Sequence, residues 1–154
     1  MPYGWFNSVG FVGGVSTRYQ VTLSVRKDAS GKCIRMRRSR AHMREFGSLM
    51  QRCPAHNLVG KRISVEAELR TENVDSWAGI WLRIDGLRTH LFFDNMHDRP
   101  ISGTTPWTAY AIETDVPEGS EWLNYGALLV SNGTLWADNF QVMIWDETGR
   151  WIPA

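Results

Sequence analysis

The chain has 154 residues, of which 43% are hydrophobic, 21% charged and 12% aromatic, a composition that excludes a disordered chain, a collagen and a coiled coil. Lysine and arginine number 17 against 16 acidic residues, and a net charge of +1 argues against nucleic acid or an anionic membrane surface as the partner. No apolar run approaches the roughly 20 residues of a transmembrane helix and the N-terminus lacks a signal-peptide pattern, so we expect one cytoplasmic domain over residues 1–154.

Alternation of apolar and polar residues predicts short strands along most of the chain. The clearest is 62–70, where four apolar residues face one side and mostly charged residues face the other. The predicted strands, in chain order, are 18–25, 33–38, 47–53, 62–70, 77–85, 88–94, 108–115, 121–130 and 134–145. Turn residues separate several of them, at 28–31, 85–86, 117–119 and 132–133. The segments 10–14 and 39–46 are predicted as loops.

Short strands at this spacing, with hairpin signals between them and no sustained helical repeat, are typical of a sandwich or barrel. The predicted fold is therefore all-β, an antiparallel jelly-roll β-sandwich of about nine strands with no substantial helix.

Two local features carry open alternatives. Cys33 and Cys53 lie twenty positions apart, which is not a metal-finger spacing, and we expect two reduced thiols unless their strands are neighbours and form a bridge. A cluster of arginines near the first of these cysteines is interpreted as a solvated basic strand, with a local anion site as the alternative. Its members are Arg35, Arg37, Arg38, Arg40 and Arg44.

Asp85-Gly86 predicts a two-residue hairpin turn that fixes the register of the flanking strands. In that register Ile84 faces Leu87. The inward side would hold Ala78, Ile80, Leu82, Ile84, Leu91 and Phe93. The outward side would gather Trp77, Trp81, Arg83, His90, Phe92 and Asp94, with Gly79 leaving room for a ligand between the tryptophans.

This outward side is the predicted site. His90 and Asp94 are the candidate proton donor and acceptor, and Arg83 is the candidate oxyanion stabiliser. Trp77, Trp81, Phe92 and Tyr125 are the candidate substrate-binding residues. The alternatives are tryptophans covered by loops, a surface histidine with a turn-capping aspartate, and an ion pair of Asp98 with Arg99 that fixes the loop.

A resemblance supports the predicted fold. The segments Gly4-Trp5, Gly60–Val65 and Leu135–Val142 resemble the jelly-roll modules of the carbohydrate-binding type, with a galactose-binding-like fold. The segments Trp77–Gly86 and Phe93–Thr105 are similar to small uncharacterised bacterial domains, some of which occur alongside transcriptional regulators. The resemblance implies a ligand on an aromatic sheet face, and a structural calcium at Asp138.

We expect no metal, because the first part of the chain has no carboxylate before Asp28 to complete such a calcium site. We also expect no cofactor, because phosphate-binding loops, nucleophile elbows and histidine-rich metal motifs are missing from the sequence.

Two functions are predicted. The first is a cofactor-free cyclase or isomerase of natural-product biosynthesis, which folds an apolar, polyketide-like substrate in an aromatic pocket with acid–base assistance. Cyclases on jelly rolls that resemble carbohydrate-binding modules are a known class. The alternative is a non-catalytic sensor module that binds a carbohydrate or another small ligand on the same face. An aromatic strip would also suit a homodimer interface.

Overall fold

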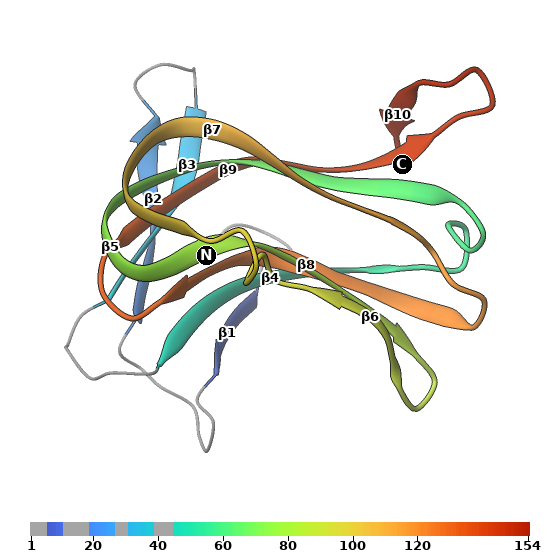
Figure 1. Ribbon diagram of the computed structural model, residues 1–154, viewed down its shortest axis with the longest axis horizontal. Coiled ribbons are helices and arrows are strands. Elements are labelled where there is room, and N and C mark those ends of the chain that lie inside the picture. The colour runs from blue at the N-terminus through green and yellow to red at the C-terminus, as the bar shows by residue number, and fades with distance from the viewer. Residues whose placement is uncertain (1–5, 11–18, 27–30, 39–44) are drawn as a thin grey trace.

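The computed structural model describes residues 6–10, 19–26, 31–38 and 45–154, and in these ranges the chain forms strands and no helix (Figure 1). The strands are β1 (Phe6–Gly10), β2 (Tyr19–Arg26), β3 (Gly31–Arg38), β4 (Phe46–Pro54), β5 (Arg62–Gly86), β6 (His90–Asp94), β7 (Ile101–Asp115), β8 (Ser120–Val130), β9 (Thr134–Trp145) and β10 (Trp151–Pro153). None of the described segments is a helix able to cross a membrane.

Several sequence features fall partly or wholly outside the described residues. They are the Gly4-Trp5 segment, the loops predicted at 10–14 and 39–46, the turn at 28–31, Arg40 and Arg44.

The strands form one antiparallel sheet in the order β1-β4-β8-β5-β9-β3-β2, with β6 and β7 also paired to β5 and β10 paired to β9. The first half of β5 pairs with β7 and β9, whereas its second half pairs with β8 and β6. The long β5 strand therefore passes from one layer of a sandwich to the other, as Figure 1 shows. We call β2, β3, β9, β7 and the first half of β5 the first layer, and β1, β4, β8, β6 and the second half of β5 the second layer.

The core lies between the two layers. The first half of β5 shows this most clearly, because Ile63, Val65, Ala67 and Leu69 alternate along the strand, point inward and are almost fully buried. Burying each large aliphatic side chain contributes about 1.5–3 kcal/mol. The largest fully buried side chains are Met36, Leu49, Ile63, Val65, Leu69, Ile80, Leu82, Ile84, Ile112, Leu123, Leu129 and Leu135.

The predicted all-β jelly roll is confirmed, with differences in detail. The strands predicted at 62–70 and 77–85 are the two halves of the single strand β5, and β1 and β10 were not predicted. Cys33 and Cys53 are both free thiols, in agreement with the expectation. Burial raises the pKa of each thiol, so both favour the protonated form.

The register predicted for the β5–β6 hairpin is wrong. The Gly86 N–H donates to the Thr89 carbonyl (2.9 Å), so the turn comes after Asp85 instead of at it. Leu82 pairs with Asp94, and a bulge after Ile84 brings Asp85 opposite His90. Because of the bulge and the longer turn, the side chains of residues 92–94 face the opposite side of the sheet from the one predicted. Phe93, for which the sequence predicts a place in the core, is 58% exposed.

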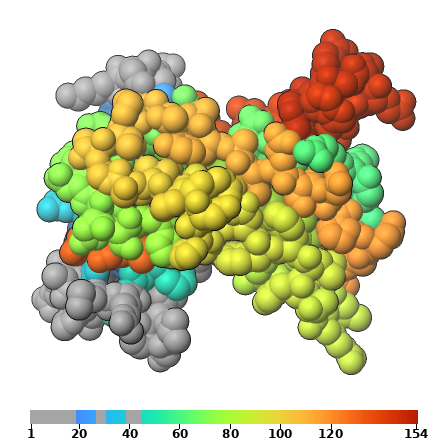
Figure 2. Space-filling model, in the orientation of Figure 1, coloured from blue at the N-terminus to red at the C-terminus, as the bar shows by residue number. Residues whose placement is uncertain are grey.

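Two hairpins project from the same end of the sandwich. Figures 1 and 2 show the β5–β6 hairpin at the lower right and the β9–β10 hairpin at the upper right. Trp145 and Trp151 pack edge to face across the β9–β10 hairpin, with their ring centres 5.1 Å apart.

Candidate functional site

His90 has a different carboxylate partner from the one predicted. Its Nδ1 atom lies 2.6 Å from Asp85 Oδ1, and Asp85 Oδ2 accepts hydrogen bonds from Arg83 (3.0 Å) and Asn124 (2.7 Å). Partial burial raises the pKa of Asp85, but the hydrogen bonds from His90 and Arg83 outweigh it and hold the pKa below its ordinary value. Asp85 thus orients a histidine whose side chain is 66% exposed. A catalytic role for His90 and Arg83 stays a prediction.

Asp94 does not pair with His90, so the predicted acid–base pair is not assembled. Its carboxylate accepts hydrogen bonds from Arg99 (2.7 and 3.2 Å) and from the Met96 N–H (2.8 Å). Arg99 also donates a hydrogen bond to Asp98 (2.8 Å), which is the ion pair that the sequence offers as a contact fixing the loop. Phe92 pairs with Ile84 and packs partly buried against the core, on the same side of β6 as Asp94. Both residues were expected on the outward side, and the bulge after Ile84 is the reason for the difference.

Trp77 and Trp81 lie on the outward side of the second layer, as predicted, but this side is covered there. Trp81 is only 7% exposed, and the ring of Trp77 packs edge to face against His97 at 5.0 Å. A Cβ atom at Gly79 would lie 3.1 Å from Met96 Cβ, so Met96 fills the space that was expected to receive a ligand. The alternative of tryptophans covered by a loop describes this region.

Tyr125 lies between the layers and not on a surface. It pairs with Leu82, is 7% exposed and donates a hydrogen bond to Gln51 Oε1 (3.1 Å). Burial raises its pKa to about 12. Tyr125 is therefore part of the hydrophobic core in this structure.

The outward side of the first layer, which we call the Trp136 face, is more open and more polar. The strand pairings place its side chains in rows, because directly paired residues point to the same side. One row holds Arg35, Trp136 and Arg70, and the next holds Arg37, Thr134 and Glu72.

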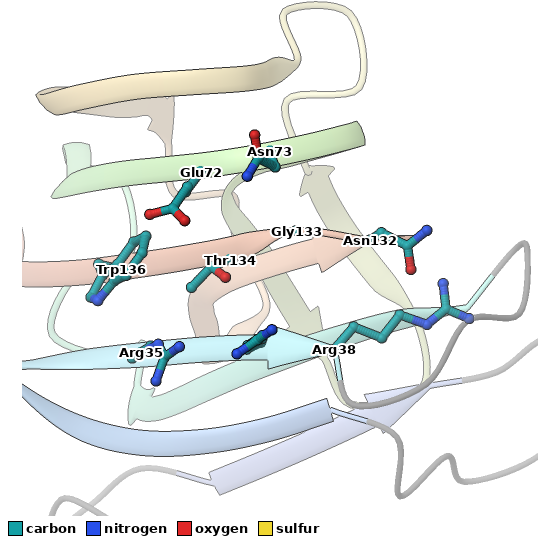
Figure 3. Close-up of a pocket in the computed structure, with 9 residues that line it drawn as sticks. Arg35, Arg38, Glu72, Asn73, Asn132, Gly133, Thr134 and Trp136 are labelled. Atoms are coloured by element: carbon teal, nitrogen blue, oxygen red, sulfur yellow. The ribbon is translucent and has the colours of Figure 1, made fainter.

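A cleft of about 400 Å³ opens at one end of the Trp136 face (Figure 3). Figure 3 shows Glu72 on β5 beside Trp136 on β9, with Arg35 on the neighbouring strand β3 and Arg38 extending toward the Asn132 end. The lining residues are Arg35, Arg37, Arg38, Glu72, Asn73, Asn132, Gly133, Thr134 and Trp136.

The β8–β9 turn at the rim of the cleft is held by Asp75. Its carboxylate accepts hydrogen bonds from the Asn132 backbone and side chain, both at 2.8 Å. Burial alone would raise the pKa of Asp75, but these hydrogen bonds together outweigh it and hold the pKa below its ordinary value. Gly133 has a φ of 128° and approaches Val74 so closely that a Cβ atom would lie 2.8 Å from Val74 Cα. The glycine therefore lets the turn pack directly on β5.

Guanidinium groups surround Trp136. The Arg70 and Arg35 guanidinium carbons lie 4.7 and 5.8 Å from the Trp136 ring centre, within cation–π range. The Arg38 side chain is 2% exposed and lies 3.7 Å from Glu45 Oε2. The cleft thus combines a flat apolar ring with a strong concentration of positive charge.

A second polar centre lies along the same face. Arg26 Nη1 pairs with Glu68 Oε2 (2.5 Å) and Asp138 Oδ2 (3.2 Å), and its guanidinium stacks 4.2 Å from the Trp107 ring centre. Asp138, the position that the resemblance suggested for calcium, therefore binds a guanidinium. Within the described residues, no three His, Cys, Asp or Glu side chains form a group that could hold a metal.

The sequence analysis names the arginines of this face only as an alternative anion site and does not include Trp136, because it concentrates on the tryptophans of the Trp77–Trp81 segment. A signal was present: Trp136 alternates with inward-pointing neighbours in the predicted strand 134–145, and Arg35 and Arg37 do so in 33–38. What the sequence does not state is that β3, β9 and β5 are neighbours, which is what brings these residues together.

No protein-family model matches the chain. Over 111 residues, 71% of the chain, it is 36% identical to the uncharacterized HTH-type transcriptional regulator YbfP of Bacillus subtilis strain 168. The chain spans 37% of the length of that relative.

Solved structures share the fold. A xylan-binding CBM22 domain superposes with a TM-score of 0.65 and 12% identity, covering 94% of this chain and 88% of that one. The C-terminal family 22 carbohydrate-binding module of Clostridium thermocellum Xyn10B superposes with a TM-score of 0.64 and 14% identity, again covering 94% of this chain and 88% of that one. A CBM4 structure superposes with a TM-score of 0.56 and 14% identity, covering 91% of this chain and 86% of that one. The chain therefore has the jelly-roll fold found in carbohydrate-binding modules.

Proposed function

We propose that this domain binds a carbohydrate, or a similar polyhydroxylated small molecule, in the cleft of the Trp136 face. The observation that carries the proposal is the placement of a partly buried indole ring among hydrogen-bonding side chains in a cleft of about 400 Å³. A sugar presents an apolar face of C–H groups and a rim of hydroxyls, so it needs both kinds of surface at once.

Each part of the cleft has a role in this proposal. Trp136 offers the apolar surface for the sugar, with the Arg35 and Arg70 guanidinium groups already beside its ring. Asn73, Asn132 and Thr134 supply neutral donors and acceptors, and Glu72 supplies a carboxylate that accepts from ligand hydroxyls. Asp75 stabilises the rim through Asn132, which reduces the ordering cost of binding.

Binding without chemistry is better supported than the cyclase that was predicted first. The cyclase depended on His90 and Asp94 acting together beside an open aromatic groove. In the structure Asp94 is bound to Arg99, and Met96 fills the space at Gly79. The carbohydrate-binding modules that share the fold support the alternative, a binding module, and the likeness to a transcriptional regulator supports a sensing role within a longer protein.

Isothermal titration calorimetry with Trp136→Ala tests the proposal. The panel holds neutral xylo-, cello- and galacto-oligosaccharides and their acidic counterparts. Loss of the stacking ring should weaken binding by about tenfold or more, because burying an aromatic contact of this kind is worth about 1.5–3 kcal/mol.

Trp145→Ala is the matched control. Trp145 lies on the same strand but packs against Trp151 in the projecting hairpin, so its loss should leave saccharide affinity unchanged. Equal affinities for wild type and Trp136→Ala would place the ligand elsewhere, and no binding by any saccharide of the panel would overturn the proposal.

A further inference from the structure

The arginine cluster of β3 extends the proposed function to a class of ligand. Arg35, Arg37 and Arg38 all line the cleft, and Glu72 is the carboxylate among its lining residues. The cleft therefore carries a surplus of positive charge, although the whole chain has a net charge of only +1.

We propose, resting on the function proposed above, that the natural ligand is an acidic saccharide whose carboxylate or phosphate is held by Arg35 and Arg37 while its ring stacks on Trp136. Arg35 pairs with Trp136 and Arg37 with Thr134, so the two arginines stand side by side along β3 next to the stacking residue. Both belong to the face onto which the cleft opens.

Buried donors in the cleft support an anionic ligand. The Nε atom of Arg35 and all three guanidinium nitrogens of Arg38 are buried and have no hydrogen-bond acceptor in the described part of the chain. Burying a charged donor without an acceptor is costly, and an anion is the strongest acceptor that a ligand can offer. Arg38 has Glu45 at 3.7 Å as its ion-pair partner, so we assign the direct contact to Arg35 and Arg37.

The shape of the cleft argues against a simple inorganic anion. A volume of about 400 Å³ lies in the range of small organic ligands and is far larger than a phosphate ion requires. Trp136 would also have no role with such an ion. A sugar ring that carries one anionic group uses the arginines, the tryptophan and the amides together.

The test compares matched pairs of ligands by calorimetry: glucuronic acid with glucose, galacturonic acid with galactose, and glucose 6-phosphate with glucose. Inorganic phosphate is titrated separately. We expect at least one acidic member to bind about tenfold or more tightly than its neutral partner, and this preference to decrease at high salt. The carboxylate and phosphate pairs show which anionic group is recognised.

The single variant Arg37→Gln and the double variant that combines Arg35→Gln with Arg37→Gln should each abolish the preference for the acidic ligand. Arg37 is exposed, so the single variant leaves the packing intact and keeps the test valid if the double variant fails to fold. Arg62→Gln is the control, because Arg62 lies on β5 away from the cleft and pairs with Glu113 at 3.0 Å.

The outcomes separate the two proposals. Equal affinity for the acidic and neutral members would overturn this inference and leave carbohydrate binding in place. Retention of the preference in Arg37→Gln and in the folded double variant would also overturn it. Failure of every saccharide, neutral or acidic, would overturn both proposals. Phosphate binding that equals that of glucose 6-phosphate and is unaffected by Trp136→Ala would overturn this inference alone.

Discussion

Asp85 and Asp94 show how neighbouring contacts decide the role of a carboxylate. Both are aspartates of the β5–β6 hairpin, yet Asp85 collects hydrogen bonds from His90, Arg83 and Asn124, whereas Asp94 binds Arg99 and a loop N–H. The Asp-Gly pair predicts a turn from its local preference alone. Because these three partners hold Asp85 in the paired part of the hairpin, the turn forms after it. The local sequence cannot show that these tertiary hydrogen bonds outweigh the turn preference of Asp-Gly.

Asp85→Asn should destabilise the domain. Loss of the charge weakens three hydrogen bonds, and a net cost of about 1–3 kcal/mol is expected at neutral pH. The folded-state pKa of Asp85 is lowered, so its stabilisation is complete above its unfolded pKa of 3.8 and is lost as the pH falls through the still lower folded value. Urea unfolding of wild type and variant at neutral and acidic pH would measure both effects.

The stability of Asp85→Asn should also depend less on pH in the acidic range than that of the wild type. Asp98→Asn serves as the control, because the Asp98 side chain is 81% exposed and its ion pair with Arg99 contributes little. A wild-type urea midpoint for Asp85→Asn at neutral pH would contradict the structural role assigned to this network.

At the scale of elements, β5 organises the molecule. Its 25 residues supply the centre of both layers, and the change of layer occurs where Asn73 has a φ of 52° and the pairing with β7 becomes irregular. The alternation that predicts strands is interrupted at this crossover. Sequence therefore predicts two strands, correctly placed, and does not predict that they are one continuous element.

The pairing of β4 with β8 depends on Gly126. A Cβ atom at this position would lie 1.7 Å from the Leu49 carbonyl oxygen, which is backbone and cannot move without shifting the strand. Gly126→Ala should therefore force the two strands apart and destabilise the domain by about 3 kcal/mol or more. Thermal unfolding followed by circular dichroism would measure the loss.

Gly31→Ala is the matched control for this substitution. Gly31 begins β3, and a Cβ atom there would meet nothing within 4 Å, so the midpoint of unfolding should change little. Similar midpoints for Gly126→Ala and the wild type would show that β4 and β8 do not approach as closely as described.

At the scale of the whole molecule, the sequence predicts the fold better than the site. Strand periodicity reports which residues point inward, and this is sufficient for an all-β sandwich. Both outward faces carry tryptophans and arginines, however, and periodicity does not show which face is covered. Met96 and His97 cover part of the Trp77 side, whereas the first layer keeps a cleft around Trp136. These facts depend on tertiary contacts between segments far apart in the chain.

A ligand that binds in the cleft should stabilise the whole sandwich. Residues of β3, β5, β9 and the β8–β9 turn line the cleft, so it exists only when these strands are paired in the folded sheet. A ligand of the folded state alone adds about 2.7 kcal/mol at a hundred times its Kd, and for a domain of this size each kcal/mol raises Tm by about 2–4 °C. An increase of about 5–10 °C is therefore expected in a thermal-shift assay with the best saccharide. Trp136→Ala should show a much smaller shift at the same ligand concentration, while Trp145→Ala should show the full one. An equal shift in both variants would mean that the stabilising ligand does not occupy the cleft, whatever its affinity.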